Sequence, residues 1–107
     1  MAKPIITFDT DVLVAALLAP SSPSARVLQL ASLGIYEASV APAALAEAER
    51  LGRAGVAGRG ATEAEVLAFR GAIAEILKDA PAGAVRCGAT ALPPERVLAA
   101  LLEGADL

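Results

Sequence analysis

The sequence has 107 residues, a formal net charge of −3, one cysteine and no histidine. This length suits one domain spanning residues 1–107, and the mildly acidic balance gives no sign of a strongly basic groove for nucleic acid. The lack of histidine excludes zinc-hydrolase sites and Ser-His-Asp triads. Any acid–base or metal chemistry must therefore use Asp and Glu.

Two features bear on location. The single cysteine, Cys87, excludes an intramolecular disulfide, which fits a reducing compartment. Residues 12–19 are all apolar, but Asp9 and Asp11 interrupt what would be the apolar region of a signal peptide. The run is also too short to span a bilayer. We therefore expect a cytoplasmic protein without membrane contact.

The chain begins with a strand-like segment and two helix-like segments. Residues 4–8 form a short β-branched and aromatic run, typical of a strand buried on both faces. Residues 12–18 follow as a short apolar helix, which Pro20 ends. Residues 24–33 carry a helical apolar stripe, and Gly34 marks the end of that helix.

The middle of the chain repeats this order. Residues 35–41 are a second strand candidate, and Pro42 stands where a helix begins. Residues 43–51 are rich in Ala and Glu, which favour helix. Residues 52–61 contain four glycines and are expected to form a loop.

The last third supplies two further helices and a weak strand. Thr62 and Glu65 have the spacing of a capping box, which predicts a helix from residue 62 to about residue 79. Residues 84–87 are a weak third strand, and residues 93–102 are expected to form the last helix. Strands that alternate with helices predict an α/β fold, a three-layer α/β/α arrangement around a short parallel sheet.

Acidic residues stand directly after the first predicted strand. Ligands of open α/β sheets bind at the carboxyl ends of strands, and carboxylates there suit Mg²⁺ or Mn²⁺. Asp9 and Asp11 occupy this position. The alternative is that one of them only caps the following helix.

Other charged residues also have two interpretations. Glu47 and Glu49 lie on different faces of one predicted helix, so only one of them can point toward the strand ends, and either can instead be solvent-exposed. Glu95 lies in the first turn of the last helix, where a carboxylate interacts favourably with the helix N-terminus. Arg53 and Arg59 could contact phosphate or simply lie in a solvated loop.

The order of these segments resembles the PIN nuclease family. Four segments, spread between residues 5 and 107, carry a resemblance that covers essentially the whole chain: residues 5–18 (IITFDTDVLVAALL), 22–40 (SPSARVLQLASLGIYEASV), 41–47 (APAALAE) and 97–107 (VLAALLEGADL). The most similar branch is that of the VapC-like toxins of toxin–antitoxin pairs.

The resemblance implies an endoribonuclease that depends on Mg²⁺ or Mn²⁺ and cleaves RNA. By position, Asp9 matches the family's first acidic ligand and Glu47 its helix glutamate. Glu95 falls where the family usually has an aspartate, and Asp11 stands where the family usually has asparagine. The resemblance thus implies Asp9, Glu47 and Glu95 as catalytic residues, and the same three with Asp11 as metal ligands.

The sequence also departs from the family. An Asp-rich run before the last helix is replaced by Ala91-Leu92-Pro93-Pro94, and the family's later strand, which ends in a further acidic ligand, does not follow Leu107. The resemblance places that strand beside residues 5–8. We therefore expect residues 5–8 to form an open apolar edge that invites self-association or needs a covering partner.

Two alternatives follow from these departures. The chain can be a catalytically silent PIN-like fragment, either an interaction module that binds an antitoxin-like partner or a decayed gene product. It can also be an unrelated α/β domain whose carboxylates only cap helices.

Overall fold

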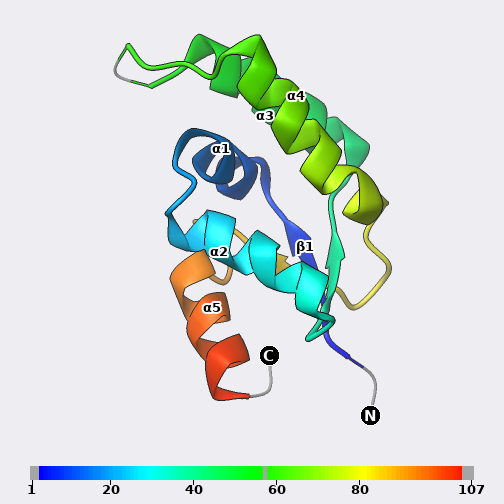
Figure 1. Cartoon of the computed structure of the whole chain (residues 1–107). Helices are drawn as coiled ribbons and strands as arrows, with labels where there is room; N and C mark the ends of the chain where they lie inside the picture. The colour runs from blue at the N-terminus through cyan, green and yellow to red at the C-terminus, as the bar shows by residue number, and fades with distance from the viewer. Residues whose placement is uncertain (1–2, 57, 105–107) are drawn as a thin grey trace.

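A computed structural model describes residues 3–56 and 58–104 of the chain (Figure 1). Within these residues ten short elements follow one another, and strands alternate with helices. In chain order they are β1 (Ile5–Phe8), α1 (Thr10–Leu18), α2 (Pro23–Leu30), η1 (Ala31–Leu33), β2 (Glu37–Ser39), α3 (Pro42–Ala54), α4 (Glu63–Ile73), η2 (Ala74–Ile76), β3 (Val85–Cys87) and α5 (Pro94–Glu103). The predicted α/β fold with a short parallel sheet is confirmed.

β1 is the central strand of a three-stranded sheet. The strand order is β2-β1-β3, and both neighbours run parallel to β1. In this register Ile6 lies opposite Ala38 on one side and opposite Val85 on the other. Ile6 and Phe8 are buried, as expected for an apolar run in a parallel sheet that helices cover.

The expectation of an open edge at residues 5–8 is wrong. Val85–Cys87 pairs with β1 along Ile6, Thr7 and Phe8, and β2 pairs with it on the other side. The weak strand near residue 85 thus takes the position that the resemblance gave to a later strand. Self-association through β1 therefore loses its structural basis, because both of its hydrogen-bonding sides are occupied.

Helices flank this sheet. Figure 1 shows α3 and α4 side by side along one flank and α5 at the opposite side, with β1 between them. α1 packs against both α2 and α3, and α2 also packs against α5. The core therefore lies between the sheet and these helices, with Leu13, Val27 and Val97 fully buried.

The only tyrosine of the sequence ties α2 to the sheet region. The ring of Tyr36 packs edge-on against Phe8, with ring centroids 6.4 Å apart. Its hydroxyl donates a hydrogen bond of 2.6 Å to the backbone carbonyl of Val27. Burial is the main cause of the pKa of this hydroxyl being raised above its ordinary value, so it acts as a neutral donor.

Several predicted helix ends are confirmed. The Thr62 hydroxyl accepts from the backbone N–H of Glu65, whose side chain accepts in turn from the backbone N–H of Thr62, completing the capping box. Pro42 is the first residue of α3. Gly34 and Gly104 end their helices in the left-handed conformation, with φ of 72° and 69°.

The ends of several elements differ from the prediction, and two of these differences follow from contacts in the fold. α3 continues to Ala54, into the predicted loop. α4 ends at Ile73 and, after η2, the chain leaves helix before residue 79 because it extends beside β2. There the backbone N–H of Val40 donates to Ile76, and that of Lys78 donates to Val40. The end of the predicted segment 97–107, residues 105–107, lies outside the described residues.

Among residues 3–56 and 58–104, no helix has both the length and the apolar character needed to cross a bilayer.

Candidate carboxylate site

Asp9 links the carboxyl end of β1 to α1. It occupies the N-cap position of α1, but its side chain makes no capping hydrogen bond. Its backbone N–H donates to the carbonyl of Cys87 at 2.9 Å, which continues the pairing of β1 with β3. The interpretation of Asp9 as a simple helix cap is therefore not supported, and its carboxylate is directed toward β3.

Arg86 is the residue that the Asp9 carboxylate meets. Its Nε donates to Asp9 Oδ2 at 3.0 Å, and its Nη2 donates to the hydroxyl of Thr90 at 3.0 Å. The Asp9 side chain is 26% exposed and that of Arg86 56% exposed. The pair is thus partly screened by water, which keeps its contribution to stability small.

Gly88 leaves room for this carboxylate. A Cβ atom at Gly88 would lie 2.7 Å from Cγ of Asp9 and 2.9 Å from its Cβ, closer than packed side chains tolerate. The next residue, Ala89, donates its backbone N–H to Asp11 Oδ2 at 2.8 Å. Asp9 and Asp11 therefore contact adjacent residues of the same loop, and their carboxylates lie at one edge of the sheet.

Glu95 joins these two residues on the side of α5. Glu95 and Asp11 both line an open cavity of about 360 Å³, together with Ser24 and Ala89. The pKa of the Cys87 thiol is raised to about 12, first by burial and then by the charges of Asp11, Asp9 and Glu95. Asp11 therefore contacts the same loop as Asp9 and lines the same cavity as Glu95.

Glu47 lies in a different environment. It is on α3 and forms an ion pair with Arg50, whose Nε donates at 3.1 Å. This hydrogen bond is the first cause of the lowered pKa of the Glu47 carboxyl. The neighbouring acid on the helix, Glu49, is the buried one, and it pairs with Arg70 of α4.

The two arginines near the predicted loop also differ from each other. Arg53 belongs to α3, and its guanidinium makes two hydrogen bonds to Glu63 of α4, at 2.6 and 3.2 Å. Arg59 lines a small cavity with Val56 and Glu65. The Arg53 side chain therefore forms an ion pair between α3 and α4.

The donor set suits a hard divalent cation. Mg²⁺ and Mn²⁺ prefer oxygen ligands, and Mg²⁺ is usually held by one or two protein carboxylates together with waters and substrate phosphates. Asp9 and Asp11 supply two carboxylates at one edge. Within the described part of the chain, no three Asp, Glu, Cys or His side chains gather closely enough to hold one ion. The residues thus fit an open site of two carboxylates rather than a closed protein cage.

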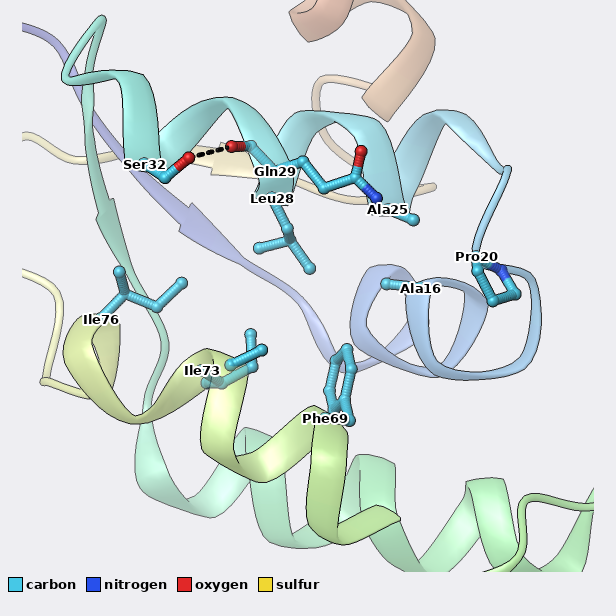
Figure 2. A pocket seen from close by; sticks show the side chains of 10 residues that line it. Ala16, Pro20, Ala25, Leu28, Gln29, Ser32, Phe69, Ile73 and Ile76 are labelled. Atoms are coloured by element: carbon cyan, nitrogen blue, oxygen red, sulfur yellow. Dashed lines mark hydrogen bonds between the residues drawn. The ribbon is translucent and has the colours of Figure 1, made fainter. Parts of the chain in front are cut away.

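A second cavity has a different chemistry. Its volume is about 340 Å³, and it lies between α1, α2 and α4. Figure 2 shows Leu28 of α2 facing Phe69, Ile73 and Ile76 across it. Its lining is mainly apolar and includes none of the four candidate acids. This cavity suits an apolar side chain, not a cation.

Sequence reasoning missed the side chains that hold Asp9. No sequence pattern connects Arg86 or Thr90 to Asp9, which precedes Arg86 by 77 residues. The sequence contained a partial signal for Arg86. Side chains alternate between the two faces of a strand, so Arg86 points to the face opposite that of the buried Cys87. The pairing of β3 with β1 was needed to place it.

The fold is that of an α/β domain, and Asp9 and Asp11 lie at the edge of the parallel sheet where ligands of open α/β sheets bind. Residues 6–103 match the family model described as PIN domain, so the chain belongs to the PIN domain family. Domains of this family generally use divalent metals, and the family points to nucleases as the class of activity. No curated protein and no solved structure matches the chain.

Proposed function

We propose that the chain is an endoribonuclease of the PIN toxin type that depends on Mg²⁺ or Mn²⁺ and works in the cytoplasm. The observation that carries the proposal is the position of Asp9 and Asp11 at the carboxyl end of β1, where both carboxylates contact β3 or the loop that follows it. Glu95 lines the same cavity as Asp11. Membership in the PIN domain family supports the same chemistry.

The three acids would have different tasks. Asp9 and Asp11 would hold the ion through oxygen ligands at the end of β1. A bound divalent ion would polarise the phosphodiester and lower the pKa of a water molecule. Glu95, across the cavity that Asp11 lines, would orient that water or accept its proton.

Glu47 would support this site from α3. As the family's helix glutamate by resemblance, it would act after exchanging its exposed contact with Arg50 for a bound ion or water. An exposed ion pair contributes little stability, so such an exchange costs little.

RNA cleavage with Mn²⁺ tests the proposal. The assay compares wild type with Asp9→Asn, which keeps the size of the side chain and removes its charge. We expect the variant to lose on the order of a hundredfold in kcat/KM. Asp79→Asn, an exposed acid outside the carboxylate site, is the matched control and should cleave as wild type does. Equal cleavage by wild type and Asp9→Asn would refute the proposal.

A second candidate function is the binding of an antitoxin-like partner by a catalytically silent domain. The apolar cavity between α2 and α4 favours it, because Leu28 and Phe69 offer a binding surface for an apolar side chain of an amphipathic helix (Figure 2). The test is co-expression with the product of any adjoining small open reading frame. Ala72→Glu, which places a charge at the cavity, should abolish co-purification.

The matched control for this test is Ala68→Glu. Ala68 is an exposed residue of the same helix and does not line the cavity. If both variants retain the partner, the cavity is not its binding site.

A further inference from the structure

Arg86 is the side chain that most directly affects the carboxylate site. Its guanidinium contacts Asp9 Oδ2 through Nε and the Thr90 hydroxyl through Nη2, each at 3.0 Å. Two anchors on different segments fix the plane of the guanidinium against the Asp9 carboxylate. Arg86 is therefore placed as a cation at an oxygen that a metal ion would also use.

The Asp9 carboxylate has little freedom to contact Arg86 and a metal ion at the same time. Its backbone is held by the hydrogen bond to Cys87, and its side chain packs against Gly88. The Asp9 side chain forms no hydrogen bond that caps α1. Arg86 thus supplies the positive charge that this carboxylate contacts in the structure.

We propose that Arg86 is the internal counter-ion of Asp9 and competes with the divalent cation for it. This inference rests on the proposed function, because it takes Asp9 as a metal ligand. Two positive charges at one carboxylate repel each other, so full metal affinity requires that Arg86 turn away from Asp9. Arg86 is exposed enough to do so without disturbing the core.

Calorimetric titration with Mn²⁺ alone tests the competition without any measurement of cleavage. The variants are Arg86→Gln, Asp9→Asn and, as the matched control, Arg53→Gln. Like Arg86, Arg53 belongs to an ion pair with an acidic side chain, but its partner Glu63 lies on α4, outside the carboxylate site. Thermal unfolding of each variant verifies that it is folded.

We expect Arg86→Gln to bind Mn²⁺ about threefold to tenfold more tightly than wild type, the range for removing a partly exposed neighbouring charge. Arg53→Gln should bind as wild type does, and Asp9→Asn should abolish binding. Tight binding by Arg86→Gln alone, with none in wild type, would support the competition most strongly.

Three results would overturn the inference, and they differ. If wild type binds Mn²⁺ through Asp9 and Arg86→Gln binds no more tightly, the competition is wrong while the proposed metal site stands. If neither protein binds Mn²⁺, the metal site and the inference fail together. An equal gain in Arg53→Gln would also overturn the inference, because the effect would then follow net charge and not the contact with Asp9.

Discussion

Glu49 of α3 and Arg70 of α4 form an ion pair in which only the carboxylate is buried. Arg70 donates through Nε to Glu49 Oε2 at 3.0 Å and through Nη2 to the other carboxylate oxygen. The Glu49 side chain is 8% exposed, whereas that of Arg70 is 48% exposed. The pair joins two helices that enclose one flank of the sheet, and it satisfies a charge that burial would otherwise disfavour.

The stability of the protein should fall in acid because of this pair. The hydrogen bond from Arg70 is the first cause of the lowered pKa of Glu49 in the folded state. Its stabilisation is therefore fully present above the ordinary glutamate pKa and is lost as the pH falls through the lower, folded pKa. Thermal unfolding followed between pH 7 and pH 3 measures this loss.

Glu49→Gln is the control for that measurement. It retains a hydrogen-bond acceptor for Arg70 but has no titrating carboxyl. We expect this variant to be less stable than wild type at pH 7 and to lose less stability on acidification. A wild-type slope in the variant would assign the acid sensitivity to other carboxylates.

Replacing Gly88 should displace the Asp9 carboxylate. A Cβ at Gly88 would meet Cγ and Cβ of Asp9 at 2.7 and 2.9 Å, so one of the two residues must move. Gly88→Ala should therefore weaken Mn²⁺ binding and cleavage. Gly71→Ala is the control, because a Cβ at this helical position meets nothing within 4 Å. It should raise stability by about 0.5–1 kcal/mol, which chemical denaturation measures.

Truncation of Ile6 should destabilise the whole fold. Ile6 is fully buried in the central strand. Ile6→Ala should lower the free energy of unfolding by about 2–5 kcal/mol, through lost burial and the cavity that remains. Leu67→Ala is the control, since Leu67 is 57% exposed on α4, and its change should stay within about 0.5 kcal/mol. Urea denaturation of both variants compares the two costs.

Cys87 should resist thiol reagents in the folded protein. The side chain is fully buried, and its pKa is raised to about 12 by burial and neighbouring carboxylates. Little thiolate then exists at pH 8, and the reagent has no access to it. We expect no reaction with a disulfide reagent in buffer and complete reaction in denaturant. Rapid labelling in buffer would show that β3 detaches readily from β1.

Local chemistry allowed much of the fold to be predicted. The capping pair of Thr62 and Glu65, the proline at position 42 and the glycine at position 34 act through contacts within a few residues. Such signals come from residues that are close together in the sequence. The boundaries they predict were therefore correct at these three positions.

Long-range pairing limited the rest. Residues 84–87 have weak strand preference, and only their register with Ile6 and Phe8 makes them part of the sheet. That pairing overturned the expected open edge and placed Arg86 beside Asp9. The position of the carboxylate site likewise depends on the loop after β3, where Ala89 contacts Asp11.

Tyr36 gives the protein an optical reporter of its own. The sequence has one tyrosine and no tryptophan, so the tyrosine band of the near-ultraviolet circular dichroism spectrum observes this ring almost alone. The ring packs against Phe8, and its hydroxyl is bonded to Val27 of α2. A single spectroscopic band therefore registers the docking of α2 onto the sheet, without any label.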